Sequence, residues 1–284
     1  MISALLGLAS ALGLGVADFM ARFSARSLGA PLAYGGVLLV GAVATTGWVI
    51  ATDPPLVWSP FGCAMAVAHG LAVATMCMLL YMGLARGPIA VVAPIVAAHP
   101  ALVLVVNVAM GVRPSLLQWG AMATVIAGGV LIARSAVSGE DTVKAQADRT
   151  TLLIALGACF SYVALVLTAQ SAAPMIGEVQ TVWIGRWAGL TLVVLILLVQ
   201  RVPIRIPSSW VPYVGVQGSL DTLGYFAFLA GSATAAPHIT MVVASTFGVV
   251  TVILARLILH EQVSWLQWSS IGLIAVGTAV LSMA

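Results

Sequence analysis

The residues of this sequence that could do chemistry are few, and they lie inside long apolar stretches. Asp221 is the most informative, because Gln217, Asp221, Gly224, Tyr225 and Phe228 share roughly 80 degrees of one helical face. A carboxylate there could meet an ammonium group, while the rings could stack on an apolar or aromatic solute. The alternative is a carboxylate that another helix neutralises, through Arg186 for example, for packing alone.

Arg186 could bind the carboxylate of a substrate, because its guanidinium is a planar fork of donors that keeps its charge. It could equally hold two helices together. Trp183 precedes Arg186 by three residues and shares its helical face, whereas Trp187 follows by one residue and is expected to point elsewhere. We therefore predict a substrate-binding site that contains Trp183, Arg186, Gln217, Asp221 and Tyr225.

His69 and His99 are single histidines in otherwise small, apolar segments, and we include both in the predicted site. Either could bond a substrate carboxylate or relay a proton near neutral pH. The alternative for each is a histidine that a neighbouring helix or a backbone carbonyl satisfies. No His, Cys and carboxylate cluster has the spacing of metal ligands, so we expect neither a metal nor a cofactor.

Asp18 precedes Arg22 by four residues, which is the favourable order for an ion pair within a helix. Because both residues lie near the end of the first apolar segment, we expect them to pair at the membrane boundary. Ser3, Gly7, Ala11 and Gly15 form a ridge of small residues upstream, which predicts close packing against another helix.

The composition indicates which solvent surrounds the chain. Its 284 residues are 62% hydrophobic and 7% charged, and the mean hydropathy is +1.14. A soluble domain needs about a quarter of its residues charged, so this surface must face a lipid bilayer. The net charge is +3, but the eleven basic residues are scattered and form no stripe that could follow a phosphate backbone. This argues against a nucleic-acid partner.

Ten apolar segments are long enough to cross a bilayer core of about 30 Å, which needs about 20 helical residues. We predict an all-α integral membrane protein with spans at residues 3–21, 31–51, 60–85, 88–111, 115–134, 150–170, 177–200, 210–231, 236–259 and 264–283. The first segment follows no basic region and continues to Ala17, so we expect a retained helix and not a cleaved signal peptide.

A charged linker divides the sequence into two similar halves. We predict a first five-helix unit at residues 1–134, a linker at 135–149 and a second unit at 150–284. An offset of 149 aligns the two copies of S-x-L-Q-W and several matching residues. The aligned pairs are Pro88 with Pro237, Ser115 with Ser264, Gln118 with Gln267, Trp119 with Trp268 and Gly128 with Gly277.

An odd number of crossings places the second unit upside down relative to the first. Such inverted repeats are typical of alternating-access carriers. The odd-numbered connections hold eight Lys or Arg residues and the even-numbered ones hold Arg113 alone, which predicts cytoplasmic odd loops and both termini outside. Pro88 and Pro237, which align, are predicted hinges, with a bent packing surface as the alternative.

The last segment, H-E-Q-V-S-W-L-Q-W-S-S-I-G-L-I-A-V-G-T-A-V-L from His260, resembles the final helix of the drug/metabolite transporter superfamily, EamA type. Glu261, Gln267, Gly272 and Gly277 match that pattern, and Arg186 resembles an Arg of the second helix of the family's repeat. The resemblance implies ten helices in two inverted units over the whole chain. Amino-acid and metabolite exporters, including the aromatic amino-acid exporter type, are the most similar in appearance.

The first half departs from this pattern, with Val112 in the place of the Glu and Gly36 in the place of the Arg. We interpret the chain as a secondary transporter of the cell (inner) membrane, functional as a monomer, that exports amino acids or related metabolites. A multidrug or other small-solute exporter of the same superfamily is the alternative. A membrane enzyme or a pore is less consistent with the sequence, which has no H-E-x-x-H, G-x-S-x-G or nucleotide-binding loop.

Overall fold

The computed structural model describes residues 1–111, 113–137 and 148–283, and every regular element in these ranges is a helix. The first half contains α1 (Ile2–Leu28), α2 (Ala30–Thr52), α3 (Pro60–Arg86), α4 (Ile89–Ala97), α5 (His99–Ala109) and α6 (Leu116–Val137). The second half contains α7 (Arg149–Ile176), α8 (Glu178–Val199), α9 (Val211–Ser232), α10 (Pro237–Ala244), α11 (Phe247–Ile258) and α12 (Trp265–Met283).

The predicted all-helical membrane class is confirmed for the described residues. Seven stretches are long and apolar enough to cross a membrane, namely α1, α2, α3, α4 with α5, α7, α8, and α10 with α11. Two shorter apolar helices, Leu116–Ile132 and Trp265–Leu281, coincide with the predicted fifth and tenth spans. The predicted eighth span is the helix α9, which carries Gln217 and Asp221. The chain is a multi-span membrane protein, and the number of ten crossings stays a prediction.

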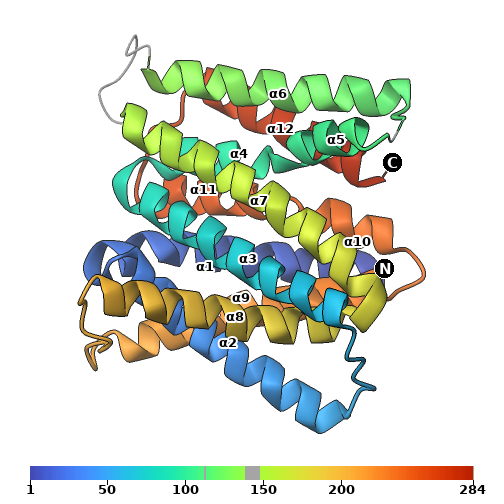
Figure 1. The fold of residues 1–284 in the computed structure, drawn as a ribbon. Helices are drawn as coiled ribbons and strands as arrows, with labels where there is room; N and C mark the ends of the chain where they lie inside the picture. The colour runs from blue at the N-terminus through green and yellow to red at the C-terminus, as the bar shows by residue number, and fades with distance from the viewer. Residues whose placement is uncertain (112, 138–147, 284) are drawn as a thin grey trace.

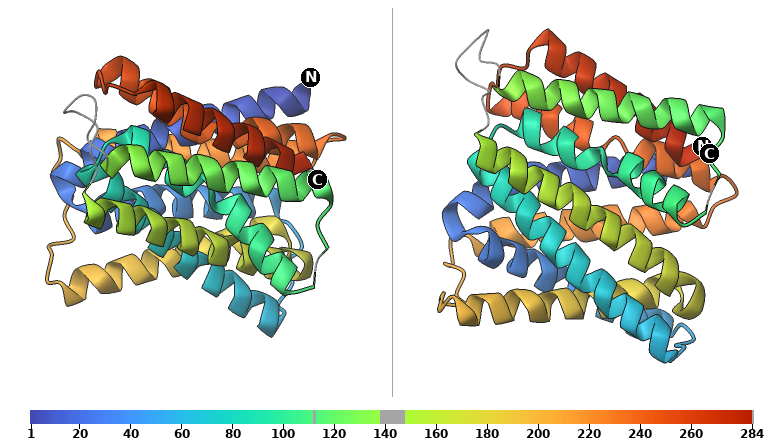
Figure 2. Two further views of the ribbon diagram at one scale, coloured as in Figure 1. Left: turned by 90° about the horizontal axis from the view of Figure 1, so that it is seen from above. Right: turned by 45° about the horizontal axis from the view of Figure 1, so that its top comes forward.

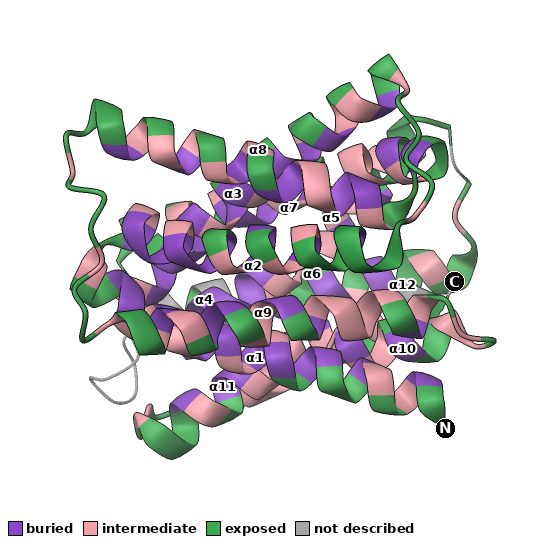
Figure 3. Ribbon diagram, turned by 90° about the horizontal axis from the view of Figure 1, so that it is seen from below, coloured by how far each residue is buried: buried purple, intermediate pink, exposed green. Residues whose placement is uncertain are grey.

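The outer surface of the helices is apolar, as a lipid-facing surface must be. Many large hydrophobic side chains point outward, including Leu5, Val43, Phe160, Leu198 and Val276. Figure 3 shows exposed residues along the outer faces of the peripheral helices and buried residues where α1, α4 and α9 face the interior.

The two ends of the chain lie on the same side of the helical body (Figure 1). The connections α1–α2, α3–α4, α8–α9 and α11–α12 lie on the opposite side. Helices α6 and α12 lie side by side and run in opposite directions, which is visible in Figure 2 as well.

The helices α6 and α12 pack reciprocally through the glycines that the repeat aligns. A Cβ on Gly128 would lie 2.8 Å from Ile274 and 2.9 Å from Ser270, and a Cβ on Gly277 would lie 2.6 Å from Val125 and 2.9 Å from Ala121. These contacts exchange under the offset of 149. The residues of α6 that contact α12 are therefore the ones that the offset aligns with the residues of α12 that contact α6.

The repeated S-x-L-Q-W motif is a capping box at the start of each of these two helices. Ser115 N donates to Gln118 Oε1 (2.8 Å) and Gln118 N donates to Ser115 Oγ (3.2 Å). Ser264 and Gln267 form the same two bonds at 3.0 and 3.2 Å. The motif therefore satisfies backbone donors that a helix start leaves unpaired.

The predicted fourth and ninth spans are both broken helices, interrupted at Ala98 and at Ser245–Thr246. Pro94 lies inside α4 and Pro100 follows the first break, which explains the interruption there. In the second, the hydroxyls of Ser245 and Thr246 bond to carbonyls three residues earlier, both at 2.7 Å. The predicted hinges Pro88 and Pro237 stand where α4 and α10 begin, more than two helical turns before the breaks.

The predicted ridge of small residues on α1 is confirmed as a packing surface, because all four of its residues are buried. A Cβ on Gly7 would lie 2.9 Å from the Thr240 carbonyl oxygen, and one on Gly15 would lie 2.7 Å from the Phe247 carbonyl oxygen. The ridge thus holds the first helix against α10 and α11.

Candidate functional site

An ion pair between Arg186 on α8 and Asp221 on α9 forms the centre of the candidate site. Arg186 Nη1 lies 2.8 Å from Asp221 Oδ2, and the exposed fractions of the two side chains are 10% and 24%. The structure therefore brings together the two charged residues that the sequence placed in one site. A buried Arg needs such a partner, and the pair also joins α8 to α9.

The guanidinium of Arg186 fits between α2 and a ring of α9. Gly41 on α2 leaves the room, because a Cβ there would lie 2.8 Å from Arg186 Nη1. On the other side, Arg186 Cζ lies 5.9 Å from the centre of the Tyr225 ring, which is cation–π distance. The predicted site residue Tyr225 therefore contacts the ion pair. Gly41 was not predicted, since a glycine in an apolar helix gives no sign of its partner.

Gln217 joins the same face of α9 to α1 and α3. The residue is fully buried, and its Nε2 donates to the Tyr81 hydroxyl (2.8 Å) and to the Ala17 carbonyl oxygen (3.3 Å). The Tyr81 ring in turn contacts Tyr34 of α2 edge to face, with centroids 5.3 Å apart. Tyr34 and Tyr81 were missed, because a tyrosine in an apolar segment is usually a core residue.

The expected ion pair between Asp18 and Arg22 is wrong. In the described residues Arg22 pairs with Glu261, with Nη1 3.2 Å from Oε1, and it also donates to the carbonyl oxygens of Leu84 and Gly87. Asp18 instead lies within electrostatic range of Asp221. The spacing of four residues was compatible with a pair, but Arg22 reaches the end of α3, where two carbonyl oxygens and the Glu261 carboxylate accept from it.

The two tryptophans beside Arg186 are both tied to α2. Trp183 Nε1 and Trp187 Nε1 each donate to Thr46 Oγ1 at 3.0 Å. The expectation that Trp187 points elsewhere is therefore wrong, because both indole N–H groups donate to the same hydroxyl. Their outer faces line an apolar groove of about 500 Å³ between α3 and α8, together with Trp58, Leu71 and neighbouring side chains.

The two predicted histidines lie apart from each other. His69 Nδ1 contacts the Leu165 carbonyl oxygen at 3.0 Å, and its ring lies next to Gly185, beside Arg186. His99 Nδ1 contacts the Val96 carbonyl oxygen at 3.1 Å across the first helix break, and its ring stacks on Tyr162 with centroids 3.5 Å apart. Both have local partners, and a role for either in substrate binding stays a prediction.

A third ion pair is exposed and joins the last residue of α3 to the residue that precedes α7. Arg86 Nη2 is 3.4 Å from Asp148 Oδ2, and both side chains are at least half exposed. Asp148 also caps α7, accepting from the Thr151 hydroxyl and backbone N–H, and these hydrogen bonds lower the pKa of its carboxyl. A pair so open to water contributes little to stability.

Among the described residues no group of three or more His, Cys, Asp or Glu could hold a metal ion. The three cysteines, Cys63, Cys77 and Cys159, are free. The chemistry that the site offers is therefore that of one guanidinium, carboxylates, an amide and aromatic rings.

Comparison with known proteins agrees with this multi-span, transporter-like arrangement. The profile of the EamA-like transporter family matches residues 149–283, so the second half of the chain is similar to that family. None of the curated proteins compared matches the sequence.

A solved structure titled "Crystal structure of protein" shares the fold over nearly the whole chain. It superposes with a TM-score of 0.66 at 15% identity and covers 98% of this chain and 95% of its own. Identity at that level shows the fold alone. The shared fold nevertheless extends through the first half, which the family profile does not match.

Proposed function

We propose that this protein is a secondary transporter that exports amino acids or related small metabolites by alternating access. The observation that carries the proposal is the buried Arg186–Asp221 pair, held at the junction of α2, α8 and α9. A zwitterionic solute could replace each partner of the pair, its carboxylate meeting Arg186 and its ammonium group meeting Asp221. The Tyr225 ring would then cover the solute's side chain or its cation.

Two inverted five-helix units, residues 1–134 and 150–284, would rock against each other around this site. The reciprocal glycine contacts of α6 and α12 and the paired capping boxes support a twofold relation between the halves. We further propose that the protein works as a monomer in the cell membrane, with both termini outside. Energy would come from a gradient of the solute or of an ion, since the sequence has no nucleotide-binding loop.

A second candidate is export of lipophilic solutes, which the groove beside Trp183 and Trp187 favours. Its lining is almost wholly apolar, and both indole N–H groups are already bonded to Thr46. A solute that enters from the bilayer would need no polar partner in that groove.

Reconstitution into liposomes with a panel of labelled amino acids tests the proposal. We expect saturable uptake down a solute gradient that related amino acids inhibit competitively. Uptake of lipophilic cations alone would favour the second candidate. Unsaturable flux, or no flux of any solute tested, would contradict the carrier mechanism. Empty liposomes and liposomes containing an unrelated membrane protein serve as controls.

A further inference from the structure

The end of α1 is fastened to two distant connections of the chain. Arg22 Nη1 donates to the carbonyl oxygen of Gly87, in the α3–α4 connection, at 2.6 Å and to that of Leu84, in the last turn of α3, at 3.4 Å. The same nitrogen lies 3.2 Å from Glu261 Oε1, in the α11–α12 connection. Both side chains are largely shielded from solvent, with exposed fractions of 13% and 9%.

Glu261 also caps a helix that lies far from it in sequence. Its Oε1 accepts from Ile89 N at 3.3 Å and its Oε2 accepts from Ala90 N at 3.2 Å, in the first turn of α4. N–H groups in a first turn have no partner within their own helix, and negative charge is favourable there. Arg256 Nη1 donates to the Glu261 carbonyl oxygen at 3.0 Å and fixes the connection that presents the carboxylate.

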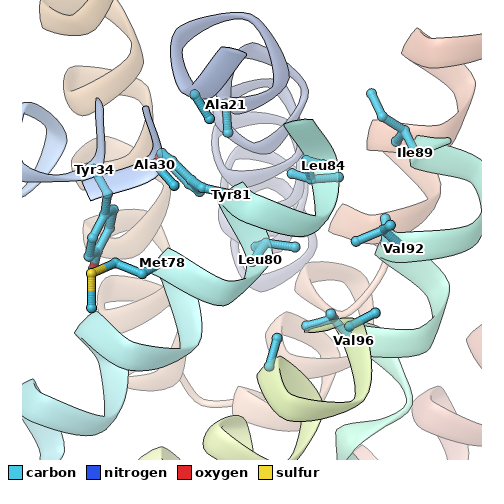
Figure 4. Packing of buried hydrophobic residues seen from close by; sticks show 14 of the residues in the cluster. Ala21, Ala30, Tyr34, Met78, Leu80, Tyr81, Leu84, Ile89, Val92 and Val96 are labelled. Atoms are coloured by element: carbon cyan, nitrogen blue, oxygen red, sulfur yellow. The ribbon is translucent and has the colours of Figure 1, made fainter. Parts of the chain in front are cut away.

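Beneath these polar contacts lies a compact apolar layer. Ala21, Leu84 and Ile89 have no exposed surface, and Figure 4 shows them with Tyr81 and Val92 where α1, α3 and α4 meet. Opening this end to solvent would move the start of α4 away from α1 and α3. That movement would break the contacts of Glu261 with Arg22 or with α4.

The opposite end of α1 is held by neutral groups. The hydroxyls of Ser3 and Thr234 lie 2.9 Å apart, and Thr240 Oγ1 donates to the Ser3 carbonyl oxygen at 3.0 Å. The repeat offset of 149 places Val112 at the position of Glu261, so the sequence supplies no carboxylate there. Hydrogen bonds to charged groups are generally worth more than neutral ones.

We propose that Arg22 and Glu261 form a latch that holds one end of the transporter closed. The latch joins α1, the start of α4 and the α11–α12 connection, so it ties the first half to the second. Because the described contacts of Ser3 at the other end of α1 join neutral groups only, the resting protein opens there first. The latch rests on the proposed alternating access, but its test measures accessibility and needs no substrate.

The test uses two reporter thiols in a background whose three native cysteines are replaced by alanine. Ala21→Cys lies in the layer beneath the latch and Ala11→Cys lies nearer Ser3, and both alanines have no exposed surface. The rate of labelling by a hydrophilic maleimide is measured in lipid nanodiscs. We expect Glu261→Gln to raise the rate at position 21 about tenfold, a change that corresponds to about 1.4 kcal/mol, and not at position 11.

Asp148→Asn is the matched control, because it breaks the exposed pair with Arg86 near the same end and should leave both rates unchanged. If Glu261→Gln does not fold, Arg22→Lys tests the same latch, since an ammonium cannot reproduce the contacts of the planar guanidinium. An unchanged rate at position 21 would overturn the latch. An equal rise at both positions would also overturn it, because it would indicate general loosening.

Discussion

Two ion pairs in the described part of the chain, both largely shielded from solvent, differ in what else they contact. Arg186 and Asp221 lie 2.8 Å apart, and in the described part of the chain no backbone group hydrogen-bonds to either side chain. Arg22 and Glu261 lie 3.2 Å apart, and each also bonds to two backbone groups. The Arg22–Glu261 pair is thus hydrogen-bonded to the backbone, whereas the Arg186–Asp221 pair has no such bond among the described residues.

This difference indicates which pair can exchange its partner for a solute. Separating Arg22 from Glu261 would leave backbone N–H groups of α4 without an acceptor, which costs about 1–3 kcal/mol for each buried group. Separating Arg186 from Asp221 leaves only two charged side chains, and a zwitterionic solute can satisfy both. We therefore propose that the Arg186–Asp221 pair exchanges with the substrate and that the Arg22–Glu261 pair holds one end closed.

The largest expected effect on uptake comes from disrupting the proposed substrate pair, Arg186 and Asp221. Asp221→Asn should lower the initial rate of uptake at least about 30-fold, because removing one partner of a buried charge pair costs about 2 kcal/mol or more. Glu261→Gln should lower it by less than about tenfold, since the groups that meet the solute are unchanged. Uptake by proteoliposomes measures both.

Gel filtration and circular dichroism of the two variants control for folding. Equal losses in the two folded variants would show that the ion pairs do not differ in role. A loss only in Glu261→Gln would reverse the assignment.

A smaller effect on uptake is expected when Gly41, which leaves room for Arg186, is replaced by alanine. Gly41→Ala would place a Cβ 2.8 Å from Arg186 Nη1, whereas a Cβ on Gly47 of the same helix meets nothing within 4 Å. We expect Gly41→Ala to raise the KM of uptake roughly fivefold by shifting the guanidinium, a change of about 1 kcal/mol. Gly47→Ala should leave KM unchanged and stabilise α2 by up to about 1 kcal/mol. Identical KM values for the two variants would argue against Arg186 as a substrate ligand.

The helical, membrane-embedded architecture was predictable from sequence because apolar length alone decides it. Each predicted span coincides with a helix or with a broken pair of helices. The positions of the breaks were less predictable. Proline explains the first, but the second depends on the hydroxyls of Ser245 and Thr246, which bond to carbonyls in many unbroken helices too.

The candidate site was predictable where a charge must have a partner, as for Arg186 and Asp221. It was not predictable where several partners compete. Asp18 and Arg22 have a favourable spacing, yet Arg22 reaches two carbonyl groups and Glu261, from segments that sequence alone does not bring near. Gly41 and Thr46 were missed for the same reason, because their importance arises from what α8 presents to them.

The central claim is that Arg186 and Asp221 bind the carboxylate and the ammonium group of one solute. Its most direct test compares how strongly a transported amino acid, its deaminated acid and its decarboxylated amine inhibit uptake. In the wild-type protein we expect the amino acid to inhibit at least about 30-fold better than the deaminated acid, and Asp221→Asn should reduce this ratio toward one. A ratio that is the same in the wild type and in Asp221→Asn would contradict the claim.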